Sequence, residues 1–218
     1  MTDVLQSQKR YYAERAPEYE DWWYRRGRYA LDPEQDARWR ADVTEAQAAL
    51  DAFGVHGDVV ELAAGTGIWT RKLAQRADRV VALDANPEVL ALNTAPAELR
   101  VVDLFEWEPD DRFDLCFFSF WHSHVPEERL DAFWRTVRSA LKPDGRVFLV
   151  DNNGGGDPVH VAHTADWTET RTVAAGREFR IVKRYWRPAE LAERVAPLGF
   201  DLELRTAANG FFIYGGGQ

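Results

Sequence analysis

Short apolar runs alternate with helical segments between residues 58 and 151, and this alternation limits the folds open to the chain. Each run ends at a turn or an acidic residue, as buried strands do. Strands that alternate with helices form a parallel sheet covered by helices on both faces. The expected strands are residues 58–63, 79–83, 99–102, 113–118 and 146–150, and the expected helices are 67–76, 87–93 and 126–141.

The end of the chain breaks this alternation. Residues 202–204 and 211–214 flank Asn209 and Gly210, a dipeptide typical of a tight β-hairpin because both residues tolerate positive φ. We therefore expect the sheet to finish with an antiparallel hairpin. Residues 168–173 and 177–185 suggest a second hairpin over the sheet.

The chain is interpreted as one domain with a helical N-terminal part. Asp32 and Pro33 form a typical helix start, and the helix that follows is expected to end at Gly54. The domain divides into a helical cap, a cofactor-binding core, an insertion on the substrate side, and the last helix with its hairpin. These parts are residues 1–53, 54–156, 157–187 and 188–218.

The net charge of −9 argues against nucleic-acid partners, which usually require a basic patch. The short basic clusters at 25–28 and 183–184 are interpreted as solvated surface. No apolar run approaches the roughly 20 residues that span a bilayer, and the N-terminal residues lack the apolar stretch of a signal peptide. We expect a cytoplasmic protein without a membrane partner, as a monomer or homodimer.

The segment 60–67 ends in a glycine-rich turn that lies between the first expected strand and the next helix. Glycine lets the backbone come close to a ligand, and ligands of such sheets bind at the carboxyl ends of the strands. Asp84 and Asp103 follow the next two strands, where carboxylates can accept hydrogen bonds from ribose hydroxyls and an adenine amine. Both acids can alternatively cap helices. The turn has no third glycine after Gly67, which disfavours a nicotinamide cofactor.

The order of these motifs resembles that of class I S-adenosylmethionine-dependent methyltransferases. The similar segments are residues 61–67, Asp84, Asp103 with Leu104, 113–121, 141–146 and the terminal hairpin. The resemblance implies a Rossmann-like α/β fold with a mostly parallel seven-stranded sheet, a terminal antiparallel hairpin, helices on both faces and an N-terminal helical cap. It also implies S-adenosylmethionine as the cofactor. Ala63 stands where many members have their first glycine.

The resemblance further assigns roles to single residues. Glu61 is expected to bind the amino-acid end of the cofactor, and Gly65 and Gly67 are expected to border it. Asn86 either approaches the ribose or caps the next helix. The other candidates for cofactor binding are Leu104 and three aromatic residues that can alternatively serve helix packing or the core: Tyr12, Tyr19 and Phe120.

The acceptor site is expected where aromatic and polar side chains gather near the ends of the fourth and fifth strands. His124 and His122 are the candidates for a catalytic base, because the pKa of histidine lies near neutrality. His124 alternatively caps a helix or contacts the cofactor. No metal is expected, because His160 and His163 lack a third ligand nearby. The candidates for substrate binding are Trp23, Tyr24, Trp121, Asp151 and Asn152.

These features predict a methyltransferase that acts on a small-molecule metabolite, by O-methylation of a hydroxyl on an aromatic or hydrophobic acceptor. A carboxyl or N-methyltransferase of a small molecule is the nearest alternative. A relative that binds S-adenosylmethionine without catalysis is the second.

Overall fold

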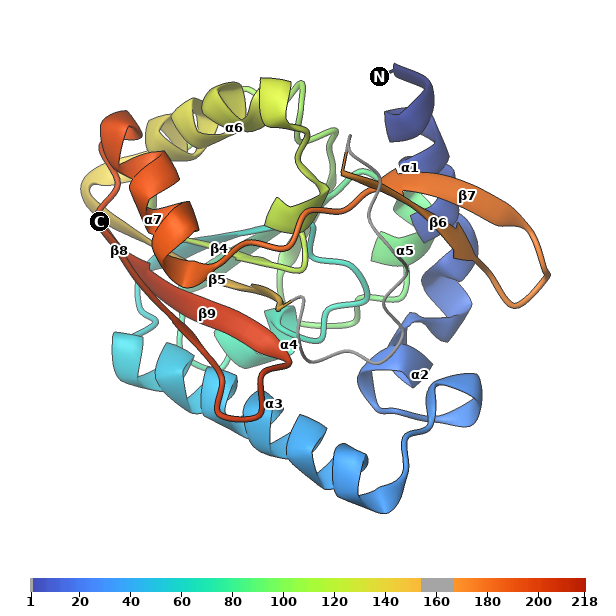
Figure 1. Cartoon of the computed structure of the whole chain (residues 1–218). Helices are drawn as coiled ribbons and strands as arrows, with labels where there is room; N and C mark the ends of the chain where they lie inside the picture. Colours follow the sequence, from blue (N-terminus) through green and yellow to red (C-terminus); the bar gives the residue numbers. More distant parts are fainter. Residues whose placement is uncertain (1, 154–166) are drawn as a thin grey trace.

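The computed structural model describes residues 2–153 and 167–218, and its centre is a seven-stranded sheet (Figure 1). The strands lie in the order β3-β2-β1-β4-β5-β9-β8, and β9 alone runs antiparallel to its neighbours. This confirms the predicted fold class. The terminal hairpin inserts its second strand between β5 and β8. The strands are β1 (Asp58–Leu62), β2 (Arg79–Asp84), β3 (Glu98–Val101), β4 (Phe113–Ser119), β5 (Leu141–Asn152), β8 (Leu202–Thr206) and β9 (Phe212–Gly217).

Helices cover both faces of the sheet. In Figure 1, α6 (Glu127–Ala140) and α7 (Pro188–Val195) lie on one face and α3 (Pro33–Phe53) on the other. Strand β4 serves both cores, because its successive side chains point to opposite faces. Cys116 and Phe118 pack beneath α6, whereas Leu115 and Phe117 pack on the side of α3. Burial on both faces explains why this strand is a continuous apolar run.

The start of α3 follows the sequence prediction. The Asp32 carboxylate accepts hydrogen bonds from the backbone N–H groups of Glu34 and Gln35, at 3.1 and 3.0 Å. These bonds satisfy two of the donors that a helix leaves unpaired at its first turn. Before α3 come α1 (Thr2–Arg15), α2 (Tyr19–Trp23) and two short 3-10 turns at Ala16–Glu18 and Gly27–Tyr29.

Two helices and one strand differ from the predicted lengths. Helices α4 (Thr70–Leu73) and α5 (Pro87–Leu90) are single turns. The rest of each predicted helix consists of hydrogen-bonded turns. Strand β5 is longer than the predicted strand at 146–150, because it begins at Leu141 and ends at Asn152. The register between β4 and β5 jumps from Phe113–Leu141 to Leu115–Arg146, so the extra residues bulge out of the ladder.

The second predicted hairpin is also present, as a separate two-stranded sheet. Strands β6 (Thr168–Thr172) and β7 (Glu178–Val182) pair antiparallel. Tyr11 of α1 packs with Val173 and Ile181 of this hairpin, and Figure 1 shows α1 and the hairpin side by side. Within residues 2–153 and 167–218, no helix is both long and apolar enough to cross a membrane.

Candidate active site

The turn after β1 adopts the backbone conformation that favours glycine at three positions. Gly65 and Gly67 have φ of +59° and +85°, and Ala63 has φ of +54°. A Cβ atom on Gly67 would lie 2.0 Å from Oδ1 of Asn93, so any other residue would have to displace the Asn93 side chain. The left-handed conformation of Ala63 costs about 1–3 kcal/mol. Alanine has a small side chain, which takes up little room in this tight turn.

Asp84 connects this turn to the end of β2. Its Oδ2 accepts a hydrogen bond from the N–H of Gly65 at 3.0 Å, and its Oδ1 accepts one from the N–H of Asn86 at 2.9 Å. Burial raises the pKa of Asp84, and these backbone donors oppose the rise. The Asn86 side chain makes no capping bond to α5, so the alternative capping role is not realised.

Asp103 joins the strand ends to the N-terminal helix. Its Oδ1 accepts from the N–H of Phe105 at 3.1 Å, and its Oδ2 lies 2.5 Å from Nζ of Lys9 on α1. Lys9, Asp84 and Asp103 line one small cavity, of about 80 Å³. Eight of the ten predicted cofactor residues line it: Tyr12, Tyr19, Gly65, Asp84, Asn86, Asp103, Leu104 and Phe120.

Glu61 and Gly67 lie behind this cavity rather than in its wall. Glu61 is 1% exposed, and its Oε2 accepts a hydrogen bond from Oγ1 of Thr70 at 2.5 Å. Its Oε1 has no hydrogen-bond partner among the described residues, and burial raises the pKa of Glu61 to about 8. A buried carboxylate oxygen without a partner is costly, which favours the protonated form of the Glu61 carboxyl in the free protein.

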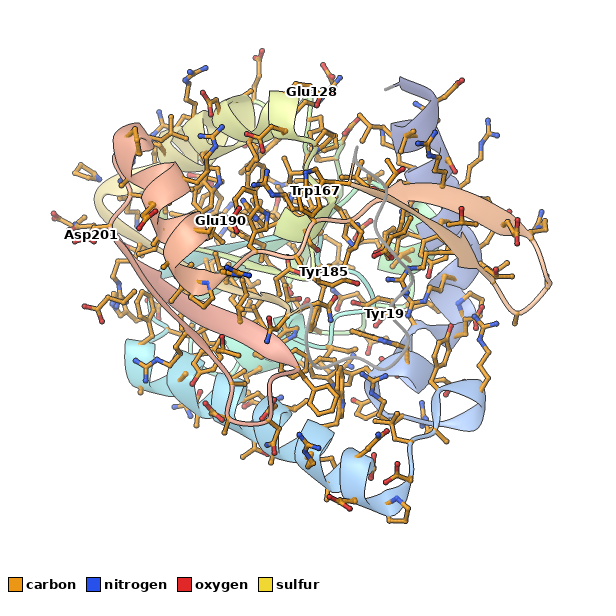
Figure 2. The ribbon with its side chains drawn as sticks, viewed as in Figure 1. Tyr19, Glu128, Trp167, Tyr185, Glu190 and Asp201 are labelled. Atoms are coloured by element: carbon orange, nitrogen blue, oxygen red, sulfur yellow. The ribbon has the colours of Figure 1, made fainter. Side chains whose placement is uncertain are left out.

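A second, larger cavity of about 450 Å³ adjoins the first. Four residues line both cavities: Tyr12, Tyr19, Phe120 and His124. Figure 2 labels Tyr19 and Tyr185, two tyrosines in the wall of the larger cavity. Within the described part of the chain, no aspartate or glutamate lines it. Its cationic residues are Arg15, Arg25, Arg28, Arg171 and Lys183.

Arg15 is a buried cation of this cavity that has no carboxylate partner among the described residues. It is 8% exposed, and no carboxylate pairs with it among residues 2–153 and 167–218. Its guanidinium lies 5.3–5.6 Å from the ring centroids of four aromatic residues. Cation–π contacts stabilise such a charge only in part. The four rings are those of Tyr11, Tyr19, Trp22 and Tyr29.

The prediction that both basic clusters are solvated is wrong for Arg25 and Lys183. They are 7% and 3% exposed, because α2 and the β6–β7 hairpin turn them inward. Lys183 donates to Oγ of Ser123 and Oδ1 of Asn152, both at 2.8 Å. A signal was present in the sequence, since aromatic residues at 22–24 and 185–186 adjoin both clusters.

The structure places the five candidates for substrate binding in different parts of the molecule. Asn152 lines the larger cavity, and Trp121 lines the smaller one. Asp151 lies behind the wall, where its carboxylate accepts from the N–H and Oγ of Ser123 at 2.8 Å. Trp23 and Tyr24 line neither of these cavities and contribute, with residues of α3, to a separate hollow of about 340 Å³. Their neighbour Trp22, which was not among the five candidates, lines the larger cavity instead.

The two histidines occupy different surroundings on the short 3-10 turn His122–His124. His124 lies at the junction of the cavities, with Nδ1 2.6 Å from the carbonyl of Val182 and Nε2 2.6 Å from the hydroxyl of Tyr12. Burial lowers its pKa well below the usual value. His122 lines neither cavity and accepts a hydrogen bond from Nε1 of Trp134 at 3.1 Å. Burial lowers the pKa of His122 to about 3.

The described residues contain no group of three metal-ligating side chains. His160 and His163, the two histidines considered as metal ligands from the sequence, lie outside the described residues.

Comparison with known proteins agrees with this geometry. Residues 59–145 match a family described as a methyltransferase domain. DhpI matches over 100% of this chain at 37% identity. Its complex with SAH is covered to 98% with a TM-score of 0.80, and the DhpI–SAM–HEP complex to 99% with a TM-score of 0.81.

Two further proteins are more distant. An uncharacterized methyltransferase of Staphylococcus carnosus (strain TM300) is 33% identical over 103 residues, which are 46% of this chain. The match spans about half (49%) of that curated relative. The 1,6-didemethyltoxoflavin-N1-methyltransferase of Burkholderia thailandensis shares the fold, with 19% identity, a TM-score of 0.59, and coverage of 95% of this chain and 88% of that one.

The chain belongs to the S-adenosylmethionine-dependent methyltransferase family. S-adenosylmethionine is accordingly its cofactor.

Proposed function

We propose that this protein is an enzyme that methylates an oxygen atom of a small anionic acceptor. The observation that carries the proposal is the buried, carboxylate-free Arg15 in a cavity whose other charged residues are also cations. A buried charge is costly unless a counter-charge accompanies it, so the cavity favours an anion. The same lining disfavours the hydrophobic acceptor expected from the sequence, and it disfavours a cationic amine.

The smaller cavity supports the cofactor roles that the sequence suggested. We assign Asp84 to the ribose hydroxyls, Asp103 and Leu104 to the adenine, and Glu61 to the amino-acid end. When bound, S-adenosylmethionine supplies a methyl carbon on a cationic sulfur. The acceptor oxygen forms a bond to that carbon as the carbon–sulfur bond breaks, which leaves S-adenosylhomocysteine and the methylated acceptor.

An oxyanion acceptor needs no general base, because its oxygen is already deprotonated. The chain therefore has to bind and orient the acceptor and to exclude water. Arg15, Arg171 and Lys183 are positioned for binding the anion. His124 is poorly suited as a free base, since both of its ring nitrogens have hydrogen-bond partners. The location of His122 away from both cavities supports a structural role for that residue.

The test is a panel of small carboxylic acids, phosphorus oxyacids, phenols and amines, with formation of S-adenosylhomocysteine as the readout. We expect turnover with members of the anionic classes alone. For the best acceptor, Arg15→Met should raise KM at least tenfold, because truncating one partner of a buried charge pair costs about 2–5 kcal/mol. Arg40→Met, on the exposed surface of α3, is the matched control. Turnover of neutral phenols or amines, with no anion accepted, would contradict the proposal.

A further inference from the structure

Three buried side chains behind the smaller cavity form a chain of hydrogen bonds that ends at Glu61. The chain runs from Asn93, which follows α5, through Thr70 at the start of α4 to Glu61 of β1. The three residues are 4%, 0% and 1% exposed. Thr70 and Asn93 line neither cavity, so they can act on a ligand only through Glu61.

The direction of each hydrogen bond in this chain follows from its first donor. The backbone N–H of Ala95 can only donate, so the atom of Asn93 that faces it at 3.1 Å is the amide oxygen Oδ1. The amide nitrogen of Asn93 then donates to Oγ1 of Thr70 at 2.9 Å. The Thr70 hydroxyl has one proton to donate, and among the described residues its acceptor is Oε2 of Glu61, at 2.5 Å.

The space beside Gly67 belongs to the Asn93 amide. A Cβ atom on Gly67 would lie 2.0, 2.4 and 2.9 Å from Oδ1, Cγ and Nδ2 of Asn93. The glycine therefore leaves room for a protein side chain. Neither the amide nor the Thr70 hydroxyl can turn away without leaving a buried polar group unpaired, which is costly.

We propose that Thr70 and Asn93 are positioning residues that make the two oxygens of Glu61 inequivalent. Oε2 accepts from the Thr70 hydroxyl both with and without the cofactor. Oε1, which has no partner among the described residues, carries the proton in the free protein. This proton leaves for solvent as the ammonium group of the cofactor takes its place. The inference rests on the proposed function in one respect, the assignment of Glu61 to the amino-acid end of the cofactor.

The Thr70 hydroxyl favours the ionised form of Glu61, because a donated hydrogen bond stabilises a carboxylate more than a carboxyl group. It thus opposes burial, which raises the pKa of Glu61 to about 8. The charged groups near Glu61 are Asp84 of β2, which raises this pKa, and Arg71 of α4, which lowers it. Arg71 also pairs with Glu20 of α2 at 3.0 Å. Loss of the Thr70 hydroxyl should therefore raise the pKa of Glu61 further.

The first experiment follows the titration of Glu61 in the free protein by carbon-13 NMR of glutamate carboxyl groups, with Glu61→Gln to assign the signal. Thr70→Val keeps the shape of the side chain but removes the hydroxyl, and it should raise the pKa of Glu61 by about one pH unit. Thr70→Ser keeps the hydroxyl and should leave the pKa unchanged. Thr44→Val is the matched control, because the hydroxyl of Thr44 bonds a carbonyl on the exposed surface of α3.

The second experiment measures binding of S-adenosylhomocysteine, which keeps the amino-acid end of the cofactor, by calorimetry at two pH values. Thr70→Val should weaken binding about tenfold at pH 7 and about threefold at pH 8.5, because the ionised fraction of Glu61 rises with pH in both proteins. Ionisation of the ligand cancels in each ratio. A variant that only disturbed the fold would lose affinity by the same factor at both pH values, and this outcome would contradict the inference.

Asn93→Leu covers the case in which Thr70→Val does not fold. It removes the donor to Thr70 and leaves the hydroxyl free to rotate, so binding at pH 7 should weaken by a smaller factor, about two- to fourfold. An unchanged titration of Glu61 in a folded Thr70→Val or Asn93→Leu protein overturns the inference. So does a Thr70→Ser protein that behaves like Thr70→Val.

The two experiments separate this inference from the proposed function, and neither needs an acceptor. A raised pKa of Glu61 with unchanged ligand affinity would support the positioning roles of Thr70 and Asn93 and contradict the assignment of Glu61 to the cofactor. An unchanged titration in Thr70→Val, together with proton release on binding that Glu61→Gln abolishes, would do the reverse.

Discussion

Two buried carboxyl groups beside the turn after β1 have different surroundings. Asp84 accepts two backbone N–H groups, whereas Glu61 has one protein donor, Thr70, and one oxygen without a partner. The pKa of both groups rises through burial, and that of Glu61 reaches about 8. Glu61 therefore holds a proton near neutral pH until a cationic partner arrives.

This predicts that cofactor binding at pH 7 releases a proton from Glu61. The free protein keeps the proton below about pH 8, and the ammonium group of the cofactor favours the carboxylate. Affinity should thus rise by up to about tenfold per pH unit between pH 6 and 7.5 and then level off. Thr70, Asp84 and Arg71 are the groups that act on Glu61. Calorimetry in two buffers of different ionisation enthalpy measures the release, and Glu61→Gln should abolish it. Identical heats in both buffers would contradict this role.

Asp84→Ala should weaken S-adenosylmethionine binding by about 1–3 kcal/mol, the scale of losing hydrogen bonds to a charged group. Titration calorimetry measures the loss. Asp114→Ala is the control. Asp114 also accepts a hydrogen bond from a backbone N–H, that of Asp58 at 2.7 Å. It lies near the start of β4, whereas Asp84 is the last residue of β2. Equal effects of both variants would show that Asp84 acts through general stability rather than ribose binding.

At the scale of elements, α1 closes one side of the smaller cavity. Leu5, Lys9 and Tyr12 contribute to its wall, and the ion pair between Lys9 and Asp103 ties the helix to the loop after β3. The side chains of this pair are 30% and 32% exposed, so water screens their attraction in part.

Lys9→Met should therefore accelerate cofactor dissociation about two- to fivefold, which corresponds to an ion pair worth up to about 1 kcal/mol. The same variant should reduce the dependence of dissociation on salt. Stopped-flow tryptophan fluorescence can follow the reaction, because Trp121 lines the cavity. Arg10→Met changes an exposed charge on the same helix and should have no such effect. If both variants accelerate release alike, helix charge rather than the ion pair is responsible.

At the scale of the whole molecule, buried titratable groups with opposite shifts determine how stability depends on pH. The pKa of His122 falls to about 3 and that of His124 falls well below its usual value, so both stay neutral in the folded state. Protonation in the unfolded state below about pH 6.5 then favours unfolding. Glu61 acts in the opposite sense, because its folded pKa is about 8 and its ordinary value is 4.5.

The free energy of unfolding should consequently be greatest near pH 6.5. From pH 8 down to 6.5 the raised pKa of Glu61 adds stability. Below pH 6.5 the two histidines together remove about 2.7 kcal/mol per pH unit while Glu61 adds about 1.4, a net loss of about 1.3. Urea unfolding between pH 5 and 8 measures this profile. His122→Gln should flatten the acidic side, and Glu61→Gln the alkaline side. A profile that neither variant alters would contradict the pKa shifts.

The sequence by itself determined the sheet and the cofactor edge of the site. Strand periodicity is local, and parallel strands bring their carboxyl ends to one edge, so Gly65, Asp84 and Asp103 could be placed together. Strained positions such as Ala63 and Phe120, both with positive φ, carried no signal, because nothing local distinguishes them from ordinary strand ends.

The larger, cation-lined cavity was decided by the tertiary structure. Arg15, Arg25, Arg171 and Lys183 come from two helical segments and a hairpin far along the chain, and they converge only when α1 packs on β7. Composition counts charges but does not tell which of them are buried. The bond between Tyr12 and His124 joins residues 112 positions apart. A local pattern cannot encode such a contact, because its geometry depends on how separate elements meet in three dimensions.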